Sequence, residues 1–256
     1  MKASIWKNSI LSFAAAVILL LLWQLGSNWI DAEIILPPPG KVLAEVYTIV
    51  ASRVFIADLK ATFSRGLWSF LLVMSTGLAA GIAAGKYAVV NASFRPLLAV
   101  IKTTPVMSII LIAIVWFHTG TVPVFAAFLI TFPIIIENCA AGIRETDKHL
   151  IEMAALYQIP PLDVLVSVSI PSMLPYIISG ARTAIGLTWK VIVAGEILSL
   201  PRNGIGSQMQ LSQLNLETGK VFAWTLIAIL LSALSQGLFS GLLFLAKRRR
   251  TLRTSS

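Results

Sequence analysis

Long apolar runs dominate the chain, and short polar or proline-rich breaks separate them. A helix of about 20 apolar residues crosses the hydrocarbon core of a bilayer, and several runs reach that length. Helices are expected there because backbone groups inside lipid must bond to one another. The pattern predicts an all-α, polytopic membrane protein with about six transmembrane helices, at about 9–30, 65–85, 97–117, 122–142, 175–199 and 221–246.

The first run is compatible with a signal peptide or with an uncleaved span, because Lys2 and Lys7 precede it. We favour an uncleaved transmembrane helix, since the apolar stretch continues towards Ile30 and no clean small-residue cleavage site follows it.

The remaining breaks divide the chain further. Between the first and second spans we expect an outer-surface loop with two short amphipathic helices, at 42–50 and 54–62. The predicted segments are an N-terminal helix (1–30), this loop (31–63), a membrane core (64–246) with an insertion at 143–172, and a basic tail (247–256).

Proline and small residues mark two of the spans. Pro105 interrupts the third, and a broken helix at membrane depth must face protein or a water-filled cavity. Pro105 is therefore a candidate for the wall of a translocation path, with a plain proline kink as the alternative. The second span carries a face of small residues that suits close packing, either within the chain or against another subunit. That face comprises Gly77, Ala79, Ala80, Gly81, Ala83 and Ala84.

Composition agrees with a membrane protein, since 57% of the residues are hydrophobic and 12% are charged, against about 25% charged in a soluble domain. The net charge of +9 would suggest nucleic acid in a soluble protein. In a membrane protein, basic residues instead fix the orientation, and no nucleic-acid partner is expected. Lys and Arg are concentrated on the side of the basic tail, which predicts that both termini and the insertion are cytoplasmic.

Residues that carry chemistry are sparse. Cys139 is the one cysteine, so an internal disulfide is impossible, and with two histidines it offers no metal-site spacing. We find no glycine-rich phosphate loop and no nucleophile elbow. We therefore expect no catalytic residue, no metal and no bound cofactor, and in particular no ATPase site.

The insertion from Asp147 to Pro171 is too polar and too rich in proline to span a membrane. Asp147 is a plausible N-cap for a helix over 148–158, which Ile159, Pro160 and Pro161 must stop. Pro161 suits the first turn of a second helix, which we expect Pro171 to break before the fifth span. Such a helix–turn–helix either docks into a groove on a partner or packs only on its own protein.

Charged residues inside spans are costly and usually face a cavity or a partner. Glu137 and Arg182 are expected at similar depth, and we predict that they form a structural ion pair. Lys190 lies near the middle of the fifth span and Glu196 towards its outer end, so with Pro105 they are the predicted lining of a translocation path. Lys190 would attract an anionic group, and the alternative is a lysine that snorkels or pairs internally.

The insertion resembles the EAA loop of permease subunits in binding-protein-dependent ABC importers. The family pattern is Glu-Ala-Ala, a glycine six residues after the glutamate, and a hydrophobic-proline pair ending nineteen residues after it. Glu152, Ala154, Ile170 and Pro171 match this pattern, whereas Met153 replaces the first alanine and Gln158 stands in the glycine position. That glycine normally permits the turn between the helices, so we expect Pro160 and Pro161 to make the turn here.

Other segments are similar to the nitrate, sulfonate, taurine and bicarbonate branch of that family: LPPPGKVL, SRGLWSFLLV, KTTPVMSIILIAIVWF, GARTAIGLTWKVIVAGEIL and NGIG. The resemblance implies a type I ABC importer permease-like fold in the inner membrane of a prokaryote. It implies three partners: a second permease subunit, in a homodimer or heterodimer, a pair of cytoplasmic ATP-binding subunits that use the ATP, and an external substrate-binding protein. The substrate would be a small organic or inorganic anion such as a sulfonate, or a vitamin-precursor-like compound.

The resemblance also implies that the helix of Glu152 sits in a groove of the ATPase and transmits its closure to the spans. The implied coupling residues are Glu152, Met153, Ala154, Ala155, Tyr157, Gln158, Pro160, Pro161 and Pro171. One alternative is a secondary transporter driven by an ion gradient, but we find no convincing inverted repeat. Another is a membrane enzyme, which is disfavoured because Asp147, His149 and Glu152 do not share one helix face.

Overall fold

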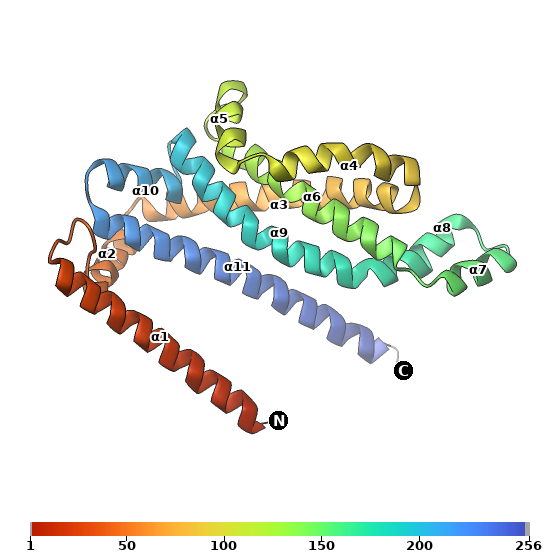
Figure 1. The fold of residues 1–256 in the computed structure, drawn as a ribbon, viewed down its shortest axis with the longest axis horizontal. Coiled ribbons are helices and arrows are strands. Elements are labelled where there is room, and N and C mark those ends of the chain that lie inside the picture. Colours follow the sequence, from red (N-terminus) through yellow and green to blue (C-terminus); the bar gives the residue numbers. More distant parts are fainter. Residues whose placement is uncertain (1, 254–256) are drawn as a thin grey trace.

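The computed structural model describes residues 2–253, without the side chains of 2–10, 12, 148 and 245–253, and the described part contains helices and no strand. Figure 1 shows the longer helices running beside one another, with α2 and α10 at one end and α7 and α8 at the other. The helices are α1 (Lys2–Ile30), α2 (Pro39–Ala51), α3 (Phe55–Lys86), α4 (Ala88–Thr103), α5 (Val106–Trp116), α6 (Val122–Arg144), α7 (Lys148–Leu156), α8 (Pro161–Val164), α9 (Ile170–Ser199), α10 (Ile205–Leu214) and α11 (Thr218–Arg253). A π-helical segment, Leu165–Ser169, joins α8 to α9.

Five helical segments are long and apolar enough to cross a membrane: Phe13–Ile30, Phe55–Lys86, Val122–Arg144, Pro161–Ser199 and Thr218–Phe244. The helix pair α4 and α5 gives a sixth candidate, which is bent by 100° at its break. The prediction of about six spans is therefore confirmed, and so is the predicted interruption of the third span at Pro105. Thr104 is extended because it precedes Pro105, and Pro105 then becomes the N-cap of α5.

Helix α6 lies between α3 and α9, and glycines let all three approach closely. A Cβ atom added to Gly81 would lie 2.5 Å from the Cβ of Cys139, which is itself fully buried. Gly77 and Gly85, one turn to either side on α3, meet Ile135 and Ile143 of α6 in the same way. Of the two uses left open for the small-residue face, the structure shows packing within the chain.

The other face of α6 packs on α9 by the same means. A Cβ on Gly142 would lie 2.7 Å from that of Met173, and a Cβ on Gly195 would lie 2.8 Å from the Cα of Pro123. Small residues are thus placed at both ends of the α6–α9 contact. Because packing must replace the hydrophobic effect between helices in lipid, these close approaches hold the core of the bundle together.

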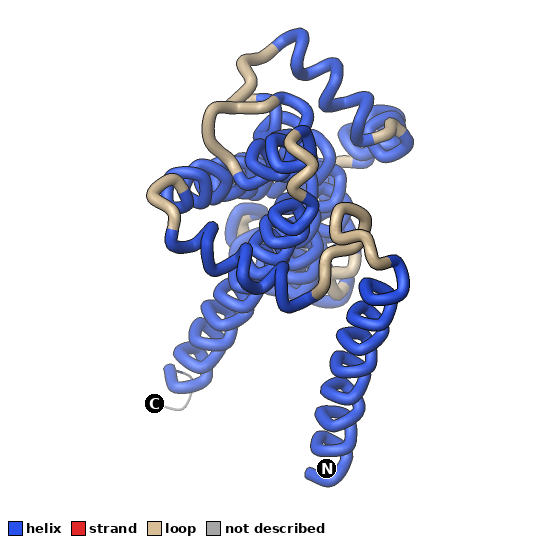
Figure 2. The backbone as a smooth tube through the Cα atoms, turned by 90° about the vertical axis from the view of Figure 1, so that its left-hand side faces the viewer, coloured by secondary structure: helices blue, strands red, loops and turns tan. Residues whose placement is uncertain are grey.

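Helices α1 and α11 contribute little to that core. Figures 1 and 2 show α1 standing apart from the bundle along most of its length, with the two ends of the chain on the same side of the molecule. Only the C-terminal part of α1 is tied down, since Trp23 Nε1 donates to the Pro37 carbonyl at 3.0 Å and Ser27 Oγ to that of Leu36 at 2.9 Å. The apolar side chains of α1 that the structure describes are mostly exposed.

One predicted boundary is wrong. The helix expected at 54–62 is not a separate surface helix, because residues 55–62 form the start of α3. The polar residues that made 54–62 look amphipathic, Asp58 and Thr62, are fully buried. Periodicity alone did not distinguish a polar face turned to water from one turned to a buried polar cluster.

Gly81→Ala is expected to lower the free energy of unfolding by about 1–3 kcal/mol, because the added methyl group overpacks the α3–α6 contact. Thermal unfolding of the purified protein in detergent measures the change. Gly237→Ala is the matched control, since nothing lies within 4 Å of the Cβ that it adds to α11. Equal stability of the two variants would show that the α3–α6 approach is looser than described.

Candidate functional site

The insertion begins as predicted. Asp147 caps α7, with one carboxylate oxygen accepting a hydrogen bond of 2.9 Å from the backbone N–H of His149. A cap of this kind satisfies one of the free N–H groups at a helix start and contributes about 1 kcal/mol.

The turn after α7 is made at Gln158, which adopts a left-handed backbone with φ of +54°. Ile159 N–H donates to the Ala154 carbonyl at 2.9 Å, and Gln158 N–H to that of Ala155 at 3.1 Å. This is the Schellman pattern that usually places glycine at such a position. The expectation that the prolines make the turn is therefore wrong: Gln158 makes it, at a cost of about 1–2 kcal/mol, and Pro161 begins α8.

The second helix of the insertion does not end at Pro171. The chain passes from α8 through the π-helical segment Leu165–Ser169 into α9, and Pro171 lies in the first turn of α9. The predicted break is wrong because the wider π turn accommodates the proline within a continuous helix. The insertion is thus joined to α9 by helical backbone with no loop between them.

Eight of the nine predicted coupling residues are exposed, and the ninth, Ala154, is 5% exposed. Among neighbouring apolar residues, Leu156 is 81% exposed, Tyr157 72% and Leu162 69%. Large apolar side chains gathered on one surface in this way mark a site of contact with another molecule.

A second site, at the α10 end of the bundle, was missed by sequence reasoning. We call it the buried polar cluster; it comprises Asp58, Thr62, Arg65, Glu196 and Asn203. Glu196 is fully buried, and its carboxylate accepts from Arg65 Nη1 at 2.5 Å, from Thr62 Oγ1 at 2.9 Å and from the Gly206 N–H at 2.9 Å. The Arg65 side chain is 14% exposed. The cluster therefore ties α3, α9 and α10 to one another.

The NGIG motif supplies the other half of this cluster. Asn203 Nδ2 and the Gly204 N–H both donate to one oxygen of Asp58, at 3.1 and 3.0 Å, and the Ile205 N–H donates to Thr62 Oγ1 at 2.9 Å. A Cβ on Gly204 would lie 2.7 Å from the carboxyl carbon of Glu196. The signal in the sequence was the helical spacing of Asp58, Thr62 and Arg65, which puts three polar side chains on one face.

Two predictions about intramembrane charges are wrong. Glu196 does not line a path, because its carboxylate is fully buried among the partners just described. Glu137 does not pair with Arg182; its carboxylate pairs instead with Lys102 Nζ at 3.0 Å, while Arg182 is exposed. No partner for Lys102 was predicted from the sequence; the bend between α4 and α5 allows α4 to lie beside α6, where Lys102 reaches Glu137.

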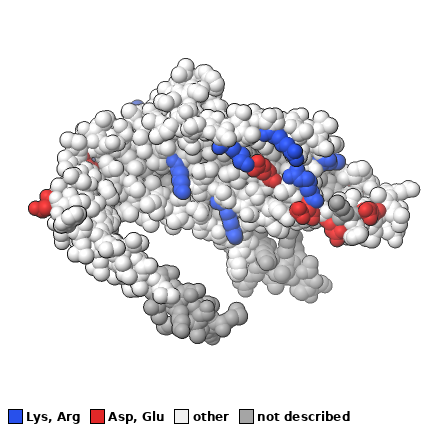
Figure 3. Space-filling view, in the orientation of Figure 1, with Lys and Arg blue, Asp and Glu red and all other residues white. Residues whose placement is uncertain are grey.

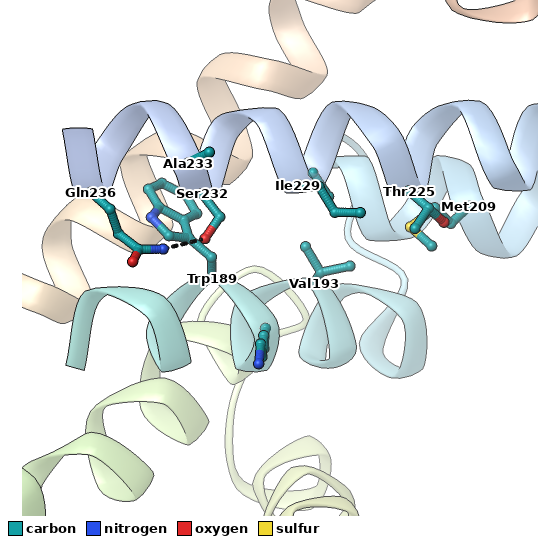
Figure 4. Close-up of a pocket in the computed structure, with 10 residues that line it drawn as sticks. Trp189, Val193, Met209, Thr225, Ile229, Ser232, Ala233 and Gln236 are labelled. Carbon is teal, nitrogen blue, oxygen red and sulfur yellow. Dashed lines mark hydrogen bonds between the residues drawn. The ribbon is translucent and has the colours of Figure 1, made fainter. Parts of the chain in front are cut away.

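Lys190 lines a groove of about 450 Å³ between α9, α10 and α11. Figure 4 shows Trp189 and Val193 of α9 pointing towards α11, where the Gln236 amide donates to Ser232 Oγ at 3.2 Å. The groove places the Lys190 cation beside one aromatic ring, that of Trp189, and the polar side chains of Thr225, Ser232 and Gln236. The structure does not bring Pro105 to it, because Pro105 lies at the α4–α5 break.

Lys102, Glu137, Arg182 and Lys190 are all exposed, although they lie on α4, α6 and α9. Figure 3 shows charged side chains gathered over these three helices and the insertion, while the described part of α1 is almost uncharged on this side. We call this the charged face. Side chains of this kind do not face lipid, so the face meets protein or water.

Glu196→Ala should lower the free energy of unfolding by about 3–5 kcal/mol, because it leaves the Arg65 guanidinium partly buried without its carboxylate. Unfolding in detergent, followed by heat or denaturant, measures this. Glu137→Ala removes a carboxylate from a half-exposed pair and should cost only about 0–1 kcal/mol. A loss at Glu196 no larger than that at Glu137 would contradict the role assigned to the cluster.

Comparison with known proteins shows that the chain is similar to several transport permease proteins. Taurine transport system permease protein TauC of Escherichia coli (strain K12) is 27% identical over 230 residues, covering 87% of this chain and 83% of the relative. Putative aliphatic sulfonates transport permease protein SsuC of Bacillus subtilis (strain 168) is 27% identical, covering 82% and 76%. Nitrate import permease protein NrtB of Synechococcus elongatus is 28% identical, covering 74% and 71%.

Among solved structures, a chain of the MetNI methionine ABC transporter in inward-facing conformations matches with a TM-score of 0.56 and 12% identity. The match covers 73% of this chain and 95% of that one, and it shows a type I ABC importer permease-like fold. Residues 77–248 match the family model of the binding-protein-dependent transport system inner membrane component. Since that match covers more than half of the chain, the protein belongs to this family of multi-pass permease components.

Proposed function

We propose that this chain is the membrane-spanning permease subunit of an ATP-driven importer and is coupled to a separate ATPase pair through the Asp147–Pro171 insertion. The observation that carries the proposal is the exposed apolar surface formed by Leu156, Tyr157 and Leu162, in the insertion that bears the EAA-like pattern. A short helix with exposed apolar side chains suits a groove on a partner. ATP is used by that partner, and this chain contributes no catalytic group.

The helical joint between α8 and α9 supports a mechanical role for the insertion. Displacement of α7 and α8 by the ATPase would be carried through Leu165–Ser169 into α9, since no flexible loop intervenes. Helix α9 bears Lys190 on its exposed side and packs along α6. Movement at the insertion therefore reaches the helix that lines the groove, as coupling requires.

The distribution of basic residues supports an orientation with both termini and the insertion in the cytoplasm. The α10 end of the bundle would then face outwards, together with α2. An external substrate-binding protein would deliver its ligand at that end. The charged face would be covered by a second permease subunit, with a water-filled path between the two, because its charges are unsuited to lipid.

The charges of that face favour an anionic substrate. Lys102, Arg182 and Lys190 are basic and Glu137 is acidic, so the face carries an excess of positive charge. The relatives named above are a taurine, a sulfonate and a nitrate permease, and substrates of that kind agree with an excess of positive charge on this face. We therefore propose a small organic or inorganic anion such as a sulfonate, with Lys190 attracting it into the path.

Leu156→Asp and Glu152→Lys are each expected to reduce the amount of ATPase that co-purifies with the permease by about tenfold, as loss of an interface hot spot does. Leu156 matters because 81% of it is exposed on the proposed docking surface. Leu214→Asp, at a residue 65% exposed on α10, should leave co-purification unchanged. Normal recovery of the ATPase with both insertion variants would rule out docking through α7.

Lys190→Gln should slow uptake of an anionic substrate by about tenfold, or roughly 1.4 kcal/mol, because it removes one cation from the proposed path. Transport into proteoliposomes with the binding protein and the ATPase measures this. Assembly should be unaffected, and Arg95→Gln, which removes an exposed cation from α4, should transport normally. Unchanged uptake with Lys190→Gln would show that Lys190 does not contact the substrate on its way.

A further inference from the structure

A crevice of about 470 Å³ separates the insertion from the ends of α3 and α6. Its walls are largely apolar, with Ile143 on one side and Ile151, Ile159 and Val164 on the other. Its volume lies within the range of small-molecule sites. Ala155 and Pro161 of the predicted coupling residues also line the crevice, but the exposed Leu156, Tyr157 and Leu162 of the proposed ATPase contact do not.

Two cations line the same crevice, Lys86 and Arg144. Both are exposed, and neither forms a salt bridge with a carboxylate in the part of the chain that the structure describes. Lys86 lies over the ring of Tyr87, 5.6 Å from its centroid. The crevice therefore combines an apolar interior with two positive charges that no described side chain neutralises.

The two cations lie where two spans end. Lys86 is the last residue of α3 and Arg144 the last residue of α6, and both helices are long and apolar enough to cross the membrane. Helices that cross a bilayer end near the phospholipid headgroups, and the exposed ring of Tyr87 is typical of that interface. A basic pocket between helices at this level suits an anionic headgroup.

We propose that this crevice binds an anionic phospholipid, with the phosphate between Lys86 and Arg144 and part of an acyl chain between the insertion and α6. The acyl chain would pack against Leu165 and Ser169, two residues of the π-helical segment that also line the crevice. The bound lipid then stabilises the insertion against the spans. Lipid binding itself does not depend on the proposed function. Only the consequence of that stabilisation for coupling to the ATPase depends on it.

The test uses the permease with its ATPase, reconstituted in nanodiscs of phosphatidylcholine with or without phosphatidylglycerol. Native mass spectrometry counts the phosphatidylglycerol molecules that stay bound after extraction. Lys86→Gln and Arg144→Gln should each weaken retention about fivefold, as expected for one basic residue near an anionic headgroup. Arg95→Gln is the matched control, because Arg95 is an exposed cation on α4 that does not line the crevice.

Val164→Phe keeps both cations but fills part of the crevice, so it should also reduce retention if an acyl chain enters. Loss of retention in all three crevice variants, with none in Arg95→Gln, supports the proposal. Equal retention by wild type and by the Lys86→Gln, Arg144→Gln double variant overturns it. Retained lipid without ATPase association would instead refute the proposed function and leave the lipid site standing.

Discussion

The fully buried carboxylate of Glu196 sets a condition that the rest of the fold must meet. A charge inside the bundle is tolerated only when donors surround it, and here they come from Arg65 and Thr62 on α3 and from the backbone of the NGIG motif. Each of these donors lies far from Glu196 in sequence or across a turn. The requirement to satisfy one carboxylate therefore fixes how α3, α9 and α10 meet. A side chain at Gly204 would collide with that carboxylate, and one at Gly206 would collide with the backbone of α9 at Val193.

Helix α9 connects this fixed point to the part of the chain that must move. One end carries Glu196, held by the buried polar cluster, and the other continues as helix through Leu165–Ser169 into the insertion. Close contacts with α6 lie near both ends of α9, where Gly142 of α6 meets Met173 and Gly195 of α9 meets Pro123. A displacement of the insertion would thus act on a rod anchored at its far end, so the largest movement is expected near the insertion and along the face that bears Arg182 and Lys190.

Several features that depend on residues close together in the sequence were predictable from the sequence alone. The apolar runs predicted α6, α9 and α11 to within a few residues, and Asp147 was correctly predicted as a cap, because both signals are local. The pairs Lys102–Glu137 and Arg65–Glu196 join residues 35 and 131 positions apart. Neither follows from periodicity, since the first requires the bend at Pro105 and the second requires the start of α3 to turn its polar face inwards. Several errors therefore concern tertiary partners. The left-handed turn at Gln158 and the continuous helix through Pro171 are local features that were also predicted wrongly.

Gln158 shows that a family position can keep its geometry without keeping its residue. A glycine there would adopt the left-handed conformation without steric cost, whereas glutamine pays about 1–2 kcal/mol for it. Two backbone hydrogen bonds from Gln158 and Ile159 close the turn, and Pro161 restricts the chain that follows. The strain lies outside the α3–α6–α9 core, in a segment whose side chains are mostly exposed. The fold therefore tolerates this strain. A partner that binds α7 and α8 in this arrangement would offset part of the free-energy cost of the left-handed conformation at Gln158.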